Sequence, residues 1–255
     1  MKSTTDQSTM EIYDDTAQQW QRNQPVILSD YTARPFILDL CETIKDRNIL
    51  DLGCGEGYVT RQLKARGASH IEGIDISEQM IEIARSYEEK DSLVINYSTG
   101  SATDLSYLGG TTFDLVIAVF LFNYLTVEEM SSVMQQVFRL LKPNGRFIFS
   151  IPHPSLPFTR PALPPFYFLP ENYGYFSGID RTFEGRIWRR DGTDVPVRCV
   201  HKTWEHYFST LRKAGFTSLP DVHELCVTES HLKLDKTFFG PLLDQPLHVV
   251  FRIER

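Results

Sequence analysis

Short apolar runs alternate with stretches of helical periodicity along most of this chain, and this alternation limits the possible folds more than any other feature. The predominantly apolar runs lie at residues 48–52, 70–74, 93–97, 113–119 and 146–151. Strands that are apolar on both faces and separated by helices belong to sheets covered on both sides. The pattern therefore predicts an α/β fold with a doubly wound, mostly parallel sheet.

The alternation is interrupted between residues 152 and 200. Seven prolines stop regular structure in residues 152–170, and aromatic side chains are dense there. Two strands at 181–190 and 194–201 are predicted to form a hairpin. The segment is too small and too rich in proline for a core of its own, so we expect a cap inserted over the sheet. The predicted organisation is an N-terminal lid (1–30), a main domain (31–151 and 201–255) and a cap (152–200).

Composition and charge exclude several classes of function. The chain has 26 Lys and Arg against 33 Asp and Glu, a formal net charge of −7, which disfavours a nucleic-acid partner because phosphate binding relies on basic side chains. The longest apolar run, 115–122, is far shorter than the roughly 20 residues of a membrane span, and the first residues lack the apolar stretch of a secretory signal. We therefore expect a cytoplasmic protein without a membrane partner.

The cysteines and acidic residues give no sign of a metal site. Four widely spaced cysteines form no Cys-x-x-Cys pair, and no His or acidic cluster has the spacing of metal ligands. A small-molecule substrate is the remaining expectation, and composition indicates no oligomeric state.

The first strand runs directly into a glycine-rich turn, where residues 49–57 read ILDLGCGEG. A turn at the first strand-to-helix junction of an open sheet is where such folds bind nucleotides. A dinucleotide fingerprint would have its third glycine at the position of Tyr58, so a nicotinamide oxidoreductase is disfavoured. Asp51 at the strand end would repel a diphosphate, whereas it would favour an ammonium or sulfonium ligand.

A second acidic residue ends the second strand. Asp75 follows the apolar run and lies beside the predicted turn, where a carboxylate can accept hydrogen bonds from two ribose hydroxyls. The alternative is that Asp75 merely precedes a helix cap at Ser77. A glycine-rich turn followed at this spacing by an acidic residue such as Asp75 is much less common than either feature alone. The combination therefore favours an adenosine-containing cofactor.

Five segments carry a resemblance to a known family: ILDLGCGEGYVT (49–60), GIDIS (73–77), GSATDL (100–105), FDLVIAV (113–119) and LLKPNGRFIFSI (140–151). They are similar to the successive motifs of class I S-adenosylmethionine-dependent methyltransferases, in the branch that acts on small molecules. The resemblance implies a Rossmann-like fold of seven strands, with the cap after the fifth strand, and S-adenosylmethionine as cofactor. It implies an enzyme of secondary metabolism that methylates N, O or C of a partly apolar or aromatic metabolite.

The resemblance also implies roles for individual residues. Gly53, Cys54 and Gly55 would lie against the methionine part of the cofactor. Asp51 would lie near its ammonium group, and Asp75 would hold its ribose.

Further residues are implied along the rest of the cofactor. Its adenine ring would pack on Ile76 and Met80. Where the family often has Asp-Ala, this chain has Ser101-Ala102, so Ser101 or the nearby Asp104 would contact the adenine edge. Phe120 would approach the cofactor from the open end of the sheet. Tyr13 resembles the family's lid tyrosine, and the alternative for it is a packing anchor.

A general base is required only if the acceptor loses its proton before or during attack. The candidate catalytic residues are His153, at the end of the fifth strand, and Glu171, in the cap. His201 and His206 are further options, and for each histidine the alternative is a hydrogen-bonded packing role.

The cap contains six arginines: Arg160, Arg181, Arg186, Arg189, Arg190 and Arg198. If several converge inward, they could hold a diphosphate on an apolar acceptor, whereas an exposed basic strand is the usual explanation. C-methylation of a prenyl diphosphate, with Glu171 removing the proton, is therefore one alternative function. A non-catalytic S-adenosylmethionine-binding protein is another.

Overall fold

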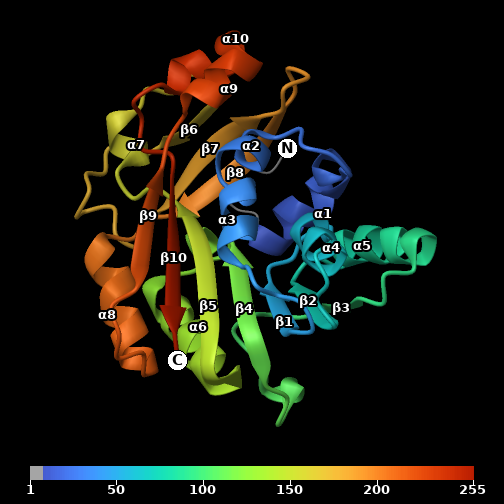
Figure 1. Ribbon diagram of the computed structural model, residues 1–255. Coiled ribbons are helices and arrows are strands. Elements are labelled where there is room, and N and C mark those ends of the chain that lie inside the picture. Colours follow the sequence, from blue (N-terminus) through green and yellow to red (C-terminus); the bar gives the residue numbers. More distant parts are fainter. Residues whose placement is uncertain (1–7) are drawn as a thin grey trace.

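A computed structural model describes residues 8–255 and contains two β-sheets (Figure 1). The larger sheet has seven strands in the order β3-β2-β1-β4-β5-β10-β9. Their bounds are β1 Asn48–Leu52, β2 His70–Asp75, β3 Asn96–Thr99, β4 Phe113–Val119, β5 Leu141–Pro152, β9 Asp221–Leu225 and β10 His248–Glu254. β1 to β5 are parallel, and β10 is antiparallel to both of its neighbours. The predicted doubly wound, mostly parallel sheet is confirmed.

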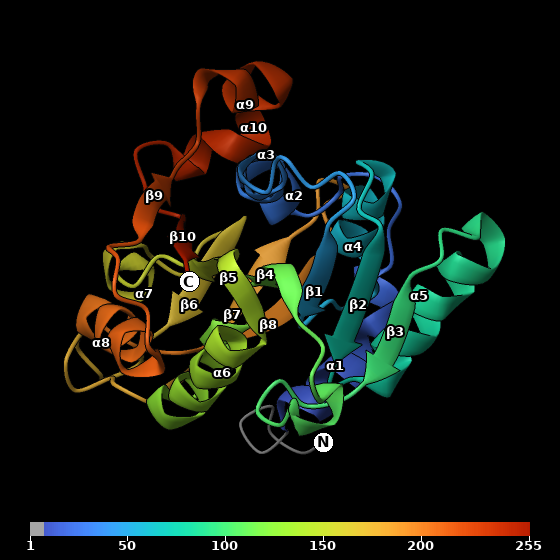
Figure 2. The same ribbon diagram turned by 60° about the horizontal axis from the view of Figure 1, so that its bottom comes forward.

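Helices cover both faces of this sheet, because successive side chains of each central strand point to opposite sides. Their bounds are α1 Thr9–Trp20, α2 Leu28–Thr32, α3 Arg34–Leu40, α4 Tyr58–Ala65, α5 Glu78–Asp91, α6 Val127–Leu140, α7 Leu156–Thr159, α8 Trp204–Ala214, α9 Glu229–Leu234 and α10 Lys236–Phe239. In β4, Val116 packs with α6 and α8, whereas Leu115 and Ile117 pack with α3, α4 and α5. Figure 2 shows α6 and α8 on one side of the sheet and α3 and α4 on the other. Within residues 8–255, no helix is long and apolar enough to cross a bilayer.

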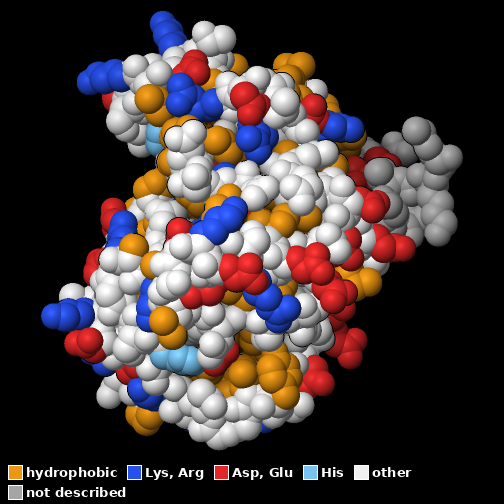
Figure 3. All heavy atoms as spheres, turned by 90° about the vertical axis from the view of Figure 1, so that its right-hand side faces the viewer, with side chains coloured by type: hydrophobic (Ala, Val, Ile, Leu, Met, Phe, Trp, Pro, Cys, Tyr) orange, Lys and Arg blue, Asp and Glu red, His pale blue; other side chains and the backbone are white. Residues whose placement is uncertain are grey.

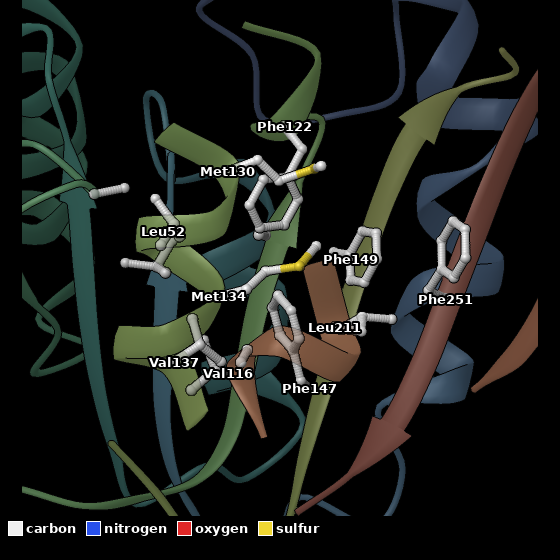
Figure 4. Close-up of a cluster of buried hydrophobic side chains, with 14 of the residues drawn as sticks. Leu52, Val116, Phe122, Met130, Met134, Val137, Phe147, Phe149, Leu211 and Phe251 are labelled. Atoms are coloured by element: carbon white, nitrogen blue, oxygen red, sulfur yellow. The ribbon is translucent and has the colours of Figure 1, made fainter. Parts of the chain in front are cut away.

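The core on the α6 and α8 side is rich in aromatic rings (Figure 4). Phe149 stacks on Phe251 at a centroid distance of 4.5 Å and meets Phe122 edge-on at 5.1 Å. α6 begins with a capping box, in which the Thr126 side chain accepts from the Glu129 amide and the Glu129 carboxylate accepts from the Thr126 amide.

The smaller sheet belongs to the cap and has the antiparallel order β6-β7-β8, with β6 Phe166–Leu169, β7 Thr182–Trp188 and β8 Asp194–Val200. The β7–β8 pair is the predicted hairpin. β6 was not predicted, because the prolines around it hide a short edge strand whose ladder forms only against β7. Its buried residues share one apolar cluster with Ile27, Leu28 and Leu247.

Several element boundaries differ from the sequence prediction. β3 begins at Asn96 instead of residue 93, because Ser92 adopts a left-handed conformation as the C-cap of α5 and Val94 also has positive φ. β5 begins at Leu141 instead of residue 146, because Leu141 already pairs with Phe113 before a register shift. α9 and α10 were not predicted, since both are too short for a clear period.

The face of the molecule that carries α1 and α5 is rich in acidic side chains (Figure 3). α5 alone contributes Glu78, Glu82, Glu88, Glu89 and Asp91. An acidic surface of this kind repels phosphate backbones, in keeping with the expected small-molecule substrate.

Candidate active site

A cavity of about 280 Å³ lies at the carboxyl ends of β1, β2 and β4. Its walls come from three parts of the chain: the edge of the large sheet, the N-terminal segment with α1, and the inner face of the cap sheet. Open α/β sheets bind ligands in this position. The cavity is therefore the candidate active site.

The glycine turn after β1 forms the floor of the cavity. Gly53 and Gly55 have φ values of +69° and +56°, which a side chain would strain, and a Cβ on Gly53 would lie 3.2 Å from Leu121. The amides of Gly53 and Cys54 donate to the Ile74 carbonyl, and the Gly55 amide donates to Asp75. These three amides are therefore engaged inside the protein and do not donate to a ligand, while the two glycines let a ligand approach the backbone closely.

Asp75 lies at the end of β2, against the turn. Its Oδ2 accepts from the Gly55 amide at 2.8 Å and its Oδ1 from the Ser77 amide at 3.0 Å. Ser77 caps α5 by accepting from the Met80 amide, so the capping role weighed for this segment is present as well. Burial raises the pKa of the Asp75 carboxyl, although these backbone donors oppose the rise. Each oxygen keeps a lone pair that can accept a ligand hydroxyl.

Asp51 lies at the end of β1 and is 1% exposed. Its Oδ2 accepts from the Thr60 hydroxyl at 2.6 Å, and within residues 8–255 it forms no ion pair with Lys, Arg or His. Burial raises the pKa of the Asp51 carboxyl to about 7. A buried carboxylate without a cation is costly, and an ammonium group entering the cavity would remove that cost.

The cavity also contains charged residues that sequence reasoning missed. Arg34 donates to Ser29 and, at 3.1 Å, to Asp30, and its guanidinium lies 5.4 Å from the Phe120 ring centroid. Arg22 bridges Asp30 and Glu56, with both ion pairs at 2.9 Å. Arg22 and Glu56 are 34 residues apart, so no local pattern places Arg22 at the cavity. Arg34 and Asp30 are only four residues apart, and that spacing is equally typical of an ion pair on a helix surface.

Tyr13 reaches the cavity from α1. Its hydroxyl is hydrogen-bonded to that of Tyr124, and its ring also packs 5.6 Å from Trp20. α1 is tied down by Asp14, which accepts from the Ser77 hydroxyl at 2.5 Å. Both roles weighed for Tyr13, cavity residue and packing anchor, are thus combined in one side chain.

Eleven of the twelve predicted cofactor residues line the cavity: Tyr13, Asp51, Gly53, Cys54, Gly55, Asp75, Ile76, Met80, Ser101, Ala102 and Phe120. Asp104 does not. It is exposed, and its carboxylate accepts from the Ser106 amide at the start of the 3₁₀ turn Ser106–Leu108. Of the two residues weighed for the adenine edge, only Ser101 is therefore within reach.

The structure places neither candidate base in the cavity wall. His153 points away toward β9, where its Nε2 lies 2.7 Å from Glu224 and its Nδ1 accepts from the Ser155 amide. Glu171 is exposed in a cap turn and has a φ of +52°. His201 bonds the Tyr175 carbonyl and His206 caps α8, so both have packing roles.

The cap arginines do not converge on the cavity. Arg160 donates to four backbone carbonyls, Arg186 pairs with Asp194, and the pairs Arg189–Asp191, Arg190–Asp235 and Arg198–Glu184 account for three more. Arg181 lies over the Tyr173 ring. The cap instead presents Phe166, Phe168, Ile187 and Val197 to the cavity. No group of three or more His, Cys, Asp or Glu in the described part of the chain could hold a metal ion.

Comparison with known proteins identifies a methyltransferase domain in the part of the chain that contains the glycine turn. A family model described as "Methyltransferase domain" matches residues 49–145. An uncharacterised protein of Haemophilus influenzae is 31% identical over 52% of this chain, and a ubiquinone biosynthesis O-methyltransferase of Coxiella burnetii is 28% identical over 57%. The matches span 53% and 62% of those relatives. An S-adenosylmethionine-dependent methyltransferase from Mesorhizobium loti shares the fold, with a TM-score of 0.65 and 24% identity over 87% of this chain and 96% of that one.

Proposed function

We propose that this chain, which carries a class I S-adenosylmethionine-dependent methyltransferase domain, methylates a small, largely apolar molecule. The family match over residues 49–145 and the shared fold confirm the predicted family, and with it the methyltransferase class and S-adenosylmethionine as the cofactor of that domain. The acceptor and the activity of the whole chain are proposals.

One observation carries the proposal: two buried or half-buried carboxylates, Asp51 and Asp75, face one cavity across a glycine turn whose Gly53, Cys54 and Gly55 amides are bonded within the protein. Asp51 fits the ammonium group of a methionyl chain, and Arg34, which lines the same cavity, fits its carboxylate. Asp75 fits the ribose hydroxyls. When bound, S-adenosylmethionine supplies a methyl group on a positively charged sulfur.

The rest of the cavity suits the acceptor. Phe166, Phe168, Ile187 and Val197 form an apolar wall from the cap sheet, and Phe120, directly after β4, adds a further ring to the cavity lining. Such walls exclude water and hold an apolar body in a fixed orientation, which is the main requirement of a direct displacement. Because one relative is named an O-methyltransferase, we place oxygen first among the possible acceptor atoms.

The alternatives considered from the sequence fit this cavity less well. A prenyl diphosphate would need cations near the apolar wall, and none of the six cap arginines lines it. A non-catalytic S-adenosylmethionine-binding protein could have the same cavity and would differ from an enzyme only in transferring no methyl group. Transfer of a labelled methyl group into an extract of the source cells, followed by mass spectrometry, separates these two functions and identifies the acceptor.

Titration with S-adenosylhomocysteine tests the cofactor site directly. We expect binding to the native protein, no binding of NADH, and a loss of affinity of about 30-fold or more in Asp75→Ala, since two hydroxyls lose a charged partner. Asp104→Ala is the matched control and should bind within about twofold of native, because Asp104 is exposed outside the cavity. Binding of NADH alone, or equal losses in the two variants, would contradict the proposal.

A further inference from the structure

Three buried side-chain atoms without a hydrogen-bond partner belong to residues that line the cavity: Trp20 Nε1, Asn123 Oδ1 and His248 Nδ1. Trp20 packs with Tyr13 beside Met80, on the cofactor side. The other two lie toward the cap. A buried polar atom without a partner is destabilising, so in a residue that lines a binding cavity it points to a ligand group that satisfies it.

His248 is held so that one ring nitrogen is bonded and the other is free. It begins β10, opposite Pro152, and is 1% exposed. Its Nε2 lies 3.0 Å from the Thr32 hydroxyl, and that hydroxyl donates to the Leu28 carbonyl at 3.1 Å. Since the Thr32 proton is used in this way, Nε2 carries the ring proton and donates to Thr32. The free Nδ1 is then a hydrogen-bond acceptor.

The surroundings keep this ring neutral. Burial, then the charge of Arg34 and then His153, lowers the pKa of His248 to about 3. The imidazole is therefore unprotonated throughout the physiological range, and Nδ1 keeps its lone pair. The rings of Phe120 and Phe166 lie 5.1 Å and 5.7 Å from the imidazole, so a group bonded to Nδ1 would be held beside an aromatic surface.

Asn123 supplies the second acceptor. It lies in the 3₁₀ turn Phe122–Tyr124 and is 3% exposed. Its Nδ2 donates to the Arg198 carbonyl of β8, and this bond orients the amide and leaves Oδ1 unpartnered. Both acceptors therefore lie on the side of the cavity that meets the cap.

We propose that His248 Nδ1 and Asn123 Oδ1 select a methyl acceptor that carries hydroxyl groups on an aromatic or apolar body, by accepting hydrogen bonds from those hydroxyls. The inference rests on the proposed function and specifies its substrate class. A hydroxyl fits better than an ammonium group, because Arg34 lies in the same cavity and repels a second cation. A site built around buried acceptors rejects analogues that lack the matching donor.

A pair of matched probes tests this selection. With the cofactor site saturated by S-adenosylhomocysteine, binding of 2-naphthol and of 2-methoxynaphthalene is measured by calorimetry. The second probe has the same ring system without a donor. We expect the native protein to prefer 2-naphthol by about tenfold, the range of one buried hydrogen bond.

Three variants assign the preference to His248. His248→Phe keeps the ring packing and should bring the two affinities to within about twofold of each other. Thr32→Val removes the acceptor for Nε2–H and should reduce the preference, since the ring proton can move to Nδ1. His223→Phe is the control, because His223 also has an unpartnered ring nitrogen and packs on Phe36 but does not line the cavity. It should keep the full preference.

The variant Asn123→Leu and the ¹⁵N chemical shifts of the His248 ring provide two independent measurements. Asn123→Leu should lower the preference partially, and ¹⁵N chemical shifts of His248 should report a proton on Nε2. Equal binding of the two probes by the native protein, or an unchanged preference in His248→Phe, would overturn the inference while S-adenosylhomocysteine still binds. Failure of S-adenosylhomocysteine to bind would instead overturn the proposed function.

Discussion

Asp51 links cofactor binding to the protonation state of the protein. It is buried at the end of β1, and the Thr60 hydroxyl is its bonded side-chain partner. With burial raising its pKa to about 7, a large fraction of the empty protein holds this carboxyl protonated at neutral pH. An ammonium group beside it would favour the ionised form, so binding and deprotonation are linked.

The first prediction concerns the pH dependence of S-adenosylhomocysteine binding. Below about pH 7 the carboxyl must lose a proton on binding, so affinity should fall by up to about tenfold per pH unit and protons should be released. Above about pH 7 the affinity should level off. Calorimetry in two buffers of different ionisation enthalpy measures the protons released.

Asp51→Asn is the control for that measurement. It should bind S-adenosylhomocysteine more weakly at high pH and show a much smaller proton release, and a full release in this variant would contradict the assignment.

The raised pKa of Asp51 also affects the stability of the protein. Folding raises the pKa of the Asp51 carboxyl from 3.8 to about 7, so the folded protein binds this proton more tightly than the unfolded chain does. The stabilisation from this proton is therefore fully present below about pH 4 and is lost as the pH rises through about 7.

Elements whose signal is local could be predicted from the sequence, and those stabilised by distant contacts could not. β1, β4 and the β7–β8 hairpin follow from apolar runs and turn residues. β6 forms only because β7 lies beside it, and no local pattern reveals such an edge strand.

The same distinction applies to the site. Gly53, Gly55 and Asp75 follow from one motif at the ends of two adjacent strands, whereas His248 comes from β10, nearly 200 residues later in the chain. The candidate base His153 failed to reach the cavity because its side chain turns toward Glu224 of β9, and that direction depends on tertiary packing. Motif spacing predicts strand ends, not side-chain direction.

Arg160 holds the cap elements together through backbone carbonyls. Its Nε donates to Phe166 at 2.6 Å, its Nη1 to Pro241 at 2.8 Å, and its Nη2 to Leu163 and Pro164 at 3.0 Å and 2.7 Å. The contacts join β6 to the loop before it and to the segment after α10. A buried cation that satisfies four carbonyls fixes the apolar wall of the cavity.

The second prediction is that Arg160→Met loosens the cap without harming the cofactor site. Removal of the guanidinium leaves several buried carbonyls without donors and should destabilise the protein by about 3 kcal/mol. Proteolysis should begin in the cap, whereas affinity for S-adenosylhomocysteine should stay within about twofold. Arg186→Met is the control, since Arg186 is a half-exposed partner of Asp194 and should change stability by less than about 1 kcal/mol. Equal effects of the two substitutions would contradict a special role for Arg160.

Across the whole molecule, a buried charge network joins the N-terminal segment to the glycine turn. Arg22, which follows α1, bridges Asp30 to Glu56 of the turn, and Arg61 of α4 pairs with Glu56 at 2.8 Å while donating to the Arg22 carbonyl. Tyr13 and Trp20 of α1 line the cavity, so the position of α1 and the shape of the cofactor site depend on the same ion pairs. Movement of Arg22 together with α1 would leave the buried carboxylates of Asp30 and Glu56 with one cation fewer, which is costly.

The last prediction follows from this coupling. Glu56→Gln removes the charge that both arginines share, so amide hydrogen exchange in α1 should accelerate by about tenfold or more, and affinity for S-adenosylhomocysteine should fall by a similar factor. Exchange in α8, on the far face of the sheet, should not change. Asp39→Asn is the control, because Asp39 pairs with Arg66 at the surface and should leave both measurements unaltered. In the native protein, S-adenosylhomocysteine should slow exchange in α1, since binding and closure are reciprocal. If α1 in Glu56→Gln exchanges at the native rate, the ion pairs only pack the chain, and α1 closes over the cavity through its apolar contacts alone.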